Sequence, residues 1–197
     1  GLAREGVDTY LAGRKKDKLL TTKQISIKEN NEGICHVIKC DVSKESDVRR
    51  MFMLIQKYHG RLDLLFNNAG IGLKANTIDK IEFKDWKKVI DTNISGMFLC
   101  AKYAYQLMKK QRPKGGRIIN NGSISAFTPR PGTAPYTASK HAISGLTKSI
   151  ALDGRKENIL CSQIDIGNAE TAITKSFKKG VIQPNGSVLK EATMNPE

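Results

Sequence analysis

The feature that most constrains the fold is a regular alternation of short strand-like runs with longer helical ones. Residues 62–66 (LDLLF) form a continuous apolar run, which is typical of a strand covered by helices on both faces. Strands are predicted over residues 7–12, 34–40, 62–66, 117–121 and 159–166, and helices over residues 16–30, 83–110 and 136–156. This spacing indicates right-handed βαβ units. We therefore expect an α/β fold with a doubly wound, mainly parallel sheet (Rossmann-like), in a single domain over residues 1–197.

A further helix is predicted to begin after residue 40, with Ser43 as its N-cap. Its apolar residues recur at helical spacing and would lie on one face: Val48, Met51, Phe52 and Ile55.

The two ends of the chain depart from the alternation. Residues 1–6 (GLAREG) resemble the last turns of a helix, and a doubly wound sheet normally has a strand and a glycine-rich phosphate turn before such a helix. No GxGxxG-type sequence occurs in the 197 residues. Residues 171–197 predict a loop-rich substrate lid with no closing strand after it. We therefore expect the first strand, its glycine-rich turn and the closing C-terminal strand to be absent, as in a fragment.

Composition and charge narrow the class of protein. Hydrophobic residues make up 39% and charged residues 26%, as in a soluble globular domain, and no apolar run approaches the roughly 18 residues of a membrane span. The 33 Lys and Arg against 19 Asp and Glu give a net charge of +14. These cations are spread along the chain, so the favoured interpretation is that they lie on solvated helix faces. Attraction of an anionic nucleotide is the second interpretation, and nucleic-acid binding is the third. We expect a cytoplasmic protein with no membrane or nucleic-acid partner.

The four cysteines (Cys35, Cys40, Cys100 and Cys161) form no CxxC pair and have no histidine at metal-ligand spacing. They are predicted to be reduced thiols within strands and helices, and no metal site is expected.

Tyr136 and Lys140 form a Tyr-x-x-x-Lys pattern at the start of a predicted helix. Residues four apart share one face of a helix, so the lysine ammonium can act on the phenol. An unperturbed tyrosine has a pKa near ~10, and a nearby cation lowers that pKa toward neutral pH. The pair therefore suggests an acid–base catalyst, although helices also carry Tyr and Lys at this spacing by chance.

Other polar residues give this pair a context. Ser123 follows a predicted strand and precedes Tyr136 with twelve residues between them, and Asn93 lies within the long helix over residues 83–110. Asn67-Asn68-Ala69-Gly70 ends an apolar strand, where a doubly wound sheet binds its ligands. In this order, the elements resemble the short-chain dehydrogenase/reductase family over the whole chain, Gly1 to Glu197.

The resemblance implies a catalytic set of Asn93, Ser123, Tyr136 and Lys140. Tyr136 would be the general acid in carbonyl reduction and the base in alcohol oxidation, and Ser123 would hydrogen-bond the substrate oxygen. Lys140 would lower the pKa of Tyr136 and hold the nicotinamide ribose, and Asn93 would support a proton-relaying water. Ser125 competes with Ser123 for its role, but the spacing to Tyr136 favours Ser123.

The same resemblance implies a set of cofactor contacts. Asp41 and Val42 would contact the adenine, and Asn68, Ala69 and Gly70 the adenosine ribose. The segment 167–171, with Gly167, Ala169 and Thr171, would contact the nicotinamide half. Ile166 stands where the family has a proline, which is a departure from its pattern.

Cofactor preference can be argued from the end of the first predicted strand. An acidic residue there would bind the ribose hydroxyls of NAD, but this chain has Gly13 followed by Arg14. A guanidinium binds phosphate in a bidentate manner, so Arg14 favours NADP over NAD.

The sequence as a whole predicts an NADP(H)-dependent oxidoreductase that interconverts a carbonyl and a secondary alcohol in a small-molecule substrate. The alternative is a catalytically weak nucleotide-binding or scaffold protein on the same fold. The apolar lid residues Ile173, Phe177, Val181, Ile182 and Val188 suggest a substrate with an apolar body. Family members commonly pair through the helices at 83–110 and 136–156, which implies a homodimer or homotetramer.

Overall fold

The computed structural model describes residues 1–29, 32–170 and 180–195. The strands are β1 (Thr9–Gly13), β2 (Cys35–Lys39), β3 (Leu64–Asn67), β4 (Gly116–Asn121), β5 (Ile159–Ile164), β6 (Val181–Ile182) and β7 (Val188–Leu189). The α-helices are α1 (Lys16–Lys28), α2 (Glu45–His59), α3 (Phe83–Ile90), α4 (Gly96–Lys110) and α5 (Ala134–Asp153). Short helical turns lie at η1 (Leu2–Glu5), η2 (Ile78–Lys80), η3 (Asp91–Ser95), η4 (Ile124–Ala126) and η5 (Arg155–Glu157).

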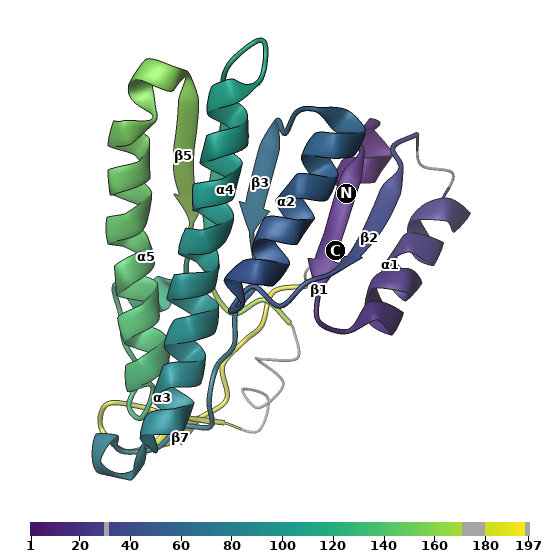
Figure 1. Ribbon diagram of the computed structural model, residues 1–197. Helices are drawn as coiled ribbons and strands as arrows, with labels where there is room; N and C mark the ends of the chain where they lie inside the picture. The colour runs from purple at the N-terminus through teal and green to yellow at the C-terminus, as the bar shows by residue number, and fades with distance from the viewer. Residues whose placement is uncertain (30–31, 171–179, 196–197) are drawn as a thin grey trace.

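The first five strands are all parallel, in two groups. β1 pairs with β2, and β4 pairs with both β3 and β5, so that Leu64 lies opposite Arg117 and Gly116 lies opposite Ile159. The arrowheads of β1, β3 and β5 point in the same direction in Figure 1, with helices packed along the strands. The predicted α/β fold is therefore confirmed, and the carboxyl ends of the strands lie together at one end of the molecule.

A cleft of about 780 Å³ separates the two groups of strands. It is lined by backbone and side chains of β1 on one side and β3 on the other, together with residues of α2 such as Phe52 and Ile55. β1 and β3 are therefore not hydrogen-bonded to each other, and each presents one strand edge to the cleft.

The core lies between α2, α4 and the β3–β4–β5 sheet. The four apolar residues predicted on one face of α2 are all buried, and they pack with Cys100, Ala104 and Met108 of α4 and Ile118 of β4. Burial of this helical face against the sheet follows directly from its 3.6-residue spacing. All four cysteines are free thiols, in agreement with the prediction.

The start of α2 differs from the prediction. Lys44, not Ser43, occupies the N-cap position. The Ser43 hydroxyl instead donates to Asp41 Oδ1 at 2.7 Å, while Asp47 Oδ2 accepts the backbone N–H of Asp41 at 3.0 Å. Because Asp41 holds Ser43 in this turn, the helix begins after it, and the acidic Glu45 and Asp47 occupy the first helical turn.

The predicted helix over 83–110 is divided. α3 and α4 are joined by η3, a π-helical turn that contains Asn93. The expected lid over 171–197 is described only from residue 180 onward, where β6 and β7 form an antiparallel hairpin. Thr171, Ile173 and Phe177 lie outside the described residues.

Candidate active site

Asn93 is fixed by the chain around it. Its side chain is 1% exposed and bonds the backbone of Ile71 twice, with Nδ2 donating to the carbonyl at 3.0 Å and Oδ1 accepting from the N–H at 2.9 Å. Nδ2 also donates to Ser139 Oγ on α5 at 3.0 Å. The π turn directs Asn93 inward, so one side chain joins η3, the loop after β3 and α5. Such turns within helices are frequent at functional sites.

Ser123 lies just beyond the end of β4. Its backbone N–H donates to Asp165 Oδ1 at 2.9 Å, and its hydroxyl oxygen accepts the N–H of Ser125 at 3.2 Å. Ser123 is therefore the N-cap of the short turn η4 and Ser125 lies within that turn, and both residues are buried.

Tyr136 stands in the first turn of α5, facing Ser123. Burial raises the pKa of Tyr136, while its hydrogen bond with Ser123 and the charge of Arg130 both act to lower it. The net shift is upward because burial outweighs the two lowering contributions, and the lowering effect expected of Lys140 stays a prediction. The Lys140 ammonium lies over the ring of Tyr136, 5.4 Å from the ring centroid.

Lys140 is the most deeply buried cation of the site. Only 5% of the residue is exposed, and Nζ donates to the backbone carbonyl of Asn121 at 2.7 Å. Burial lowers the pKa of Lys140 to about 8, and the charge of Asp165 acts in the opposite direction. Lys140 therefore sits near the midpoint of its titration under mildly alkaline conditions.

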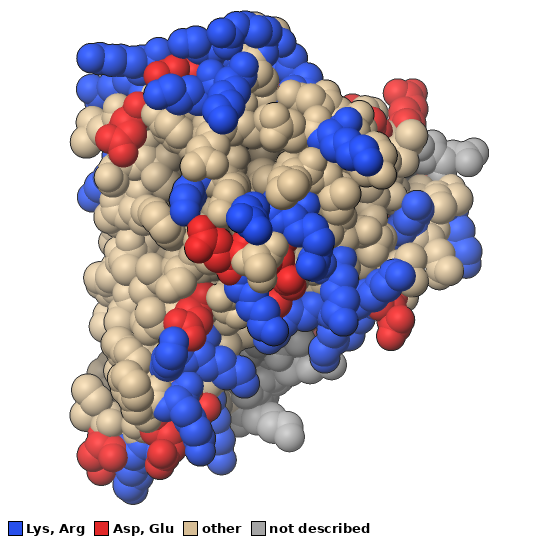
Figure 2. Space-filling view, in the orientation of Figure 1, with Lys and Arg blue, Asp and Glu red and all other residues tan. Residues whose placement is uncertain are grey.

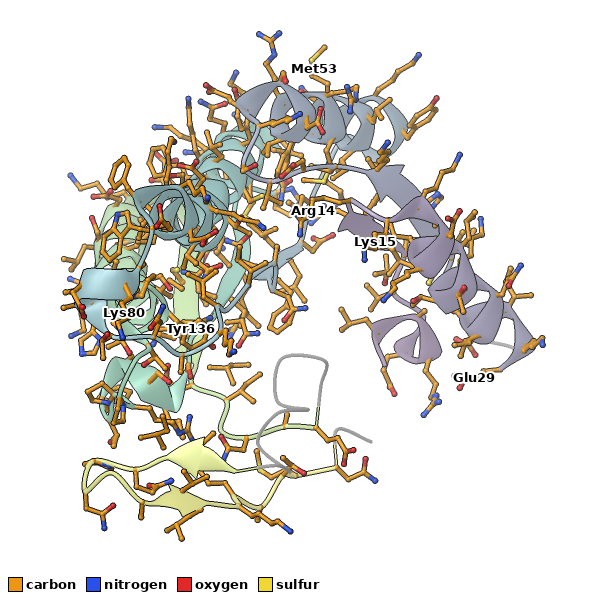
Figure 3. The ribbon with its side chains drawn as sticks, turned by 90° about the horizontal axis from the view of Figure 1, so that it is seen from below. Arg14, Lys15, Glu29, Met53, Lys80 and Tyr136 are labelled. Atoms are coloured by element: carbon orange, nitrogen blue, oxygen red, sulfur yellow. The ribbon has the colours of Figure 1, made fainter. Side chains whose placement is uncertain are left out.

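The residues predicted to bind a cofactor lie at the carboxyl ends of several strands. Arg14 follows β1 and is exposed, with no ion-pair partner within residues 1–29, 32–170 and 180–195. Val42, Asn68 and Ala69 line the cleft, but Ser123, Tyr136 and Lys140 do not. In Figure 3, which views the carboxyl ends of the strands, Arg14 and Lys15 lie on the β1 side and Tyr136 lies on the opposite side.

The remaining predicted contacts have local roles that are visible in the structure. Asp41 holds the turn before α2, and Gly70 lies against Asn93 Oδ1, 3.6 Å from where its Cβ would be. Gly167 accepts a backbone hydrogen bond from Ala169, which forms a bridge with Met194 of the C-terminal segment. Thr171, the last of the predicted contacts, is not among the described residues.

A family model described as short chain dehydrogenase matches residues 1–181. The chain belongs to this family. Its sequence is 36% identical over 173 residues to a 3beta-hydroxysteroid dehydrogenase of Mediterraneibacter gnavus, an alignment that covers 88% of this chain and 61% of that relative. The chain thus spans less than two thirds of the length of that curated relative.

Solved structures of short-chain dehydrogenases have the same fold. A gluconate 5-dehydrogenase from Burkholderia cenocepacia, in complex with NADP and tartrate, superposes with a TM-score of 0.77 at 28% identity, over 85% of this chain and 64% of that one. An actinorhodin polyketide ketoreductase with NADPH gives a TM-score of 0.82 at 26% identity, over 90% and 67% of the two chains.

Sequence reasoning missed two residues of this short-chain dehydrogenase site. Asn121, at the end of β4, accepts from Lys140 through its carbonyl and donates through Nδ2 to Asn68 Oδ1 at 2.7 Å. Asp165 holds Ser123 and acts on Lys140. Asn121 and Asp165 each lie at the carboxyl end of a strand, which is the signal that could have found them.

Proposed function

We propose that this short-chain dehydrogenase interconverts a carbonyl and a secondary alcohol with NADP(H), with Tyr136 as the general acid and base. The observation that carries the proposal is the meeting of Tyr136, Ser123 and Lys140 beside the carboxyl ends of β4 and β5. These side chains offer a proton donor, a hydroxyl and a cation to one small volume.

The chain's own residues supply the proton chemistry. When bound, the nicotinamide ring supplies or accepts the hydride. In reduction, Tyr136 would give its phenolic proton to the substrate oxygen. Burial, which raises the pKa of Tyr136, favours the protonated form that this role requires. The Ser123 hydroxyl would stabilise charge that develops on the same oxygen. Asn93 would support this arrangement by tying α5 to the loop after β3.

The residues present fit such a cofactor. Asn121 Oδ1 is buried with no hydrogen-bond partner among the described residues, and the backbone carbonyl of Asn121 contacts the Lys140 ammonium. A ribose hydroxyl could donate to this acceptor. Arg14, exposed at the end of β1, offers a guanidinium for a 2′-phosphate. The complexes of two structural neighbours with NADP and NADPH support the preference for NADP.

We further propose a small-molecule substrate and assembly through α4 and α5. Phe98 of α4 is 50% exposed and Leu152 of α5 is 58% exposed, so these helices present apolar side chains. Among the described residues, no helix is long and apolar enough to cross a membrane. Light scattering of the purified protein would test the assembly, and a monomer at micromolar concentration would contradict it.

Cofactor binding is the first test, by fluorescence titration of NADPH and NADH against the full-length protein. Tight binding of NADPH with weaker binding of NADH is the expected result. Binding of neither cofactor would contradict the proposal and would favour a scaffold role on the same fold.

Replacing Tyr136 by Phe tests the chemistry. Carbonyl reduction should fall by about a hundredfold or more, because the proton donor is removed, while NADPH affinity stays nearly unchanged. Tyr58→Phe is the matched control, since Tyr58 is an exposed tyrosine of α2. Substantial activity in Tyr136→Phe would remove Tyr136 from its assigned role.

A further inference from the structure

Asp165 lies directly after β5, at the end of the sheet where the reactive side chains gather. Its Oδ1 accepts the backbone N–H of Ser123 at 2.9 Å, at a point where the neighbouring residues Gly122 and Ile124 donate to backbone carbonyls of Ile164 and Ile166. Between β4 and the segment after β5, the N–H of Ser123 thus bonds a side-chain carboxylate, whereas the N–H groups on either side of it bond backbone carbonyls.

Gly122 shows how closely this carboxylate approaches β4. A Cβ on Gly122 would overlap Asp165 Oδ1 and would lie 2.7 Å from Gln163 Nε2. Gly122 directly follows Asn121, whose carbonyl binds the Lys140 ammonium at 2.7 Å. The backbone over residues 121–123 therefore contacts Lys140 through Asn121, and it contacts Asp165 through the two residues that follow.

Gln163 connects the carboxylate to α5, the helix that carries Tyr136 and Lys140. Its Nε2 donates to Asp165 Oδ1 at 2.6 Å and to Ser144 Oγ at 3.0 Å, while its Oε1 accepts from Thr147 Oγ1 at 3.3 Å. Ser144 and Thr147 both belong to α5, which packs along β5 (Figure 1). Asp165 is thereby tied both to Ser123 and, through Gln163, to α5.

Asp165 supplies the negative charge that opposes the buried ammonium of Lys140. Within the part of the chain that the structure describes, Asp165 is the charged group that acts on Lys140, and Arg130 acts on Tyr136. The other residues that face Lys140 are neutral: Asn121 of β4, Ser123 at the N-cap of η4 and Asn93 of η3. Tyr136, one turn earlier on α5, adds no charge here, because burial raises its pKa and so favours the neutral phenol.

We propose that Asp165 is a positioning residue of this site, which fixes the backbone of Ser123 and places a negative charge near Lys140. This assignment rests on the proposed function for its catalytic consequence. The effect of Asp165 on Lys140 does not depend on the proposed function, because it can be measured in the protein without cofactor.

Two substitutions separate the acceptor from the charge. Both of the described hydrogen bonds to the Asp165 side chain reach Oδ1, so Asp165→Asn can keep both bonds with its amide oxygen and lose only the charge. Asp165→Ala loses both the acceptor and the charge. Asp153→Asn, at the far end of α5, is the matched control for loss of one carboxylate.

The first readout is the titration of Lys140, followed in the full-length protein with isotope-labelled lysine and assigned by loss of the signal in Lys140→Met. In Asp165→Asn the pKa of Lys140 should fall by roughly half a unit or more, because the opposing charge is gone. An unchanged titration in both Asp165 variants would overturn the proposal.

The second readout is steady-state carbonyl reduction. Asp165→Ala should lose kcat by roughly tenfold to a hundredfold, with the dissociation constant for NADPH changed by less than about threefold, because Ser123 is displaced. Asp165→Asn should retain most of kcat at neutral pH and lose activity at a lower alkaline pH than the unmodified protein. Full activity of Asp165→Ala across the pH range would also overturn the proposal.

The two readouts keep the separate proposals distinguishable. If the unmodified protein reduces no carbonyl tested and yet Lys140 shifts in Asp165→Asn, the proposed function fails and the Asp165 assignment is supported. If carbonyl reduction is found but the Lys140 titration is unchanged in both variants, the proposed function is supported and the Asp165 assignment fails.

Discussion

Individual side chains of this short-chain dehydrogenase differ in how much freedom the fold leaves them. Lys140 is buried and bonded to a carbonyl, whereas Arg14 is exposed at the end of β1. Because a buried cation carries a desolvation cost and an exposed one does not, Lys140 affects the stability of the fold, whereas the role proposed for Arg14 is in cofactor choice.

The prediction for Arg14 concerns cofactor preference. Arg14→Ala should weaken NADPH binding by about tenfold and leave NADH binding nearly unchanged, because only NADPH offers a 2′-phosphate to the guanidinium. Fluorescence titration measures both affinities. Arg155→Ala, in the turn before β5 and so at the opposite end of the sheet, is the control. Equal losses for both cofactors would contradict the assignment.

The prediction for Lys140 concerns pH and stability. Its pKa is lowered from 10.5 to about 8 in the folded protein, so between these pH values the unfolded chain holds more protons at this position. Stability contributed by Lys140 therefore rises with pH through this window, and the full desolvation cost applies below it. Three thiols act in the opposite sense above pH 9, because burial raises the pKa of Cys40 and Cys161 to about 11 and that of Cys100 to about 12.

Comparison with Lys140→Met removes the thiol contribution. The free energy of unfolding of the unmodified protein, minus that of Lys140→Met, should increase by roughly 2 kcal/mol between about pH 7.5 and about pH 9.5. Urea denaturation at the two pH values measures it. Lys148→Met, an exposed lysine of the same helix, should show no such increase. A flat difference for Lys140→Met would contradict the burial of its charge.

At the scale of elements, the site depends on how closely helices approach the strand ends. Gly96, the first residue of α4 after the π turn, is one such place, because a Cβ there would lie 2.7 Å from Val42 Cγ2. The glycine thus lets the π turn with Asn93 pack against the segment that follows β2.

Substitution of two helical glycines tests this packing. Gly96→Ala should lower the free energy of unfolding by roughly 1–3 kcal/mol through overpacking against Val42, and Val42→Ala should offset part of that loss. Gly145→Ala in α5, where a Cβ meets nothing within 4 Å, should instead raise it by about 0.5–1 kcal/mol through helix propensity. Urea denaturation measures both, and a neutral Gly96→Ala would contradict the close approach.

Across the whole molecule, positive charge is in excess and widely distributed. Figure 2 shows groups of Lys and Arg side chains at the top, in the centre and in the lower half of the visible face, with fewer carboxylates among them, in line with the net charge of +14. The eight ion pairs formed by the described residues are mostly exposed, so each contributes little to stability. Repulsion among the unpaired cations should then govern the response to salt.

The melting temperature should rise when sodium chloride is increased from about 10 mM to about 200 mM, because salt screens this repulsion. Thermal unfolding followed by circular dichroism measures the change. Replacing Lys15, Lys16 and Lys18 by Gln should reduce the rise, since these cations form no ion pair in the described part of the chain. A melting temperature that falls with salt would show that the ion pairs dominate.

Much of the fold could be predicted from the sequence because local periodicity encodes it. The apolar spacing of Val48 to Ile55 gave the buried face of α2, and the apolar run at 62–66 marked β3 to within two residues. The prediction of Ser43 as the N-cap of α2 was wrong because the Ser43 hydroxyl bonds the Asp41 carboxylate and not the backbone of the helix. Which of these two hydrogen bonds forms leaves no periodic signal in the sequence.

The sequence by itself determined the order of strands and helices, the family, and the four side chains implied by its motifs, because these depend on short-range spacing and residue type. Only the tertiary structure decided that Asn121 and Asp165 belong to the site, that Asn93 lies in a π turn, and that β1 and β3 face a cleft without pairing. Each of these features depends on contacts between residues distant in the chain. Burial and charge, which set the pKa of Tyr136 and Lys140, arise only when those contacts form.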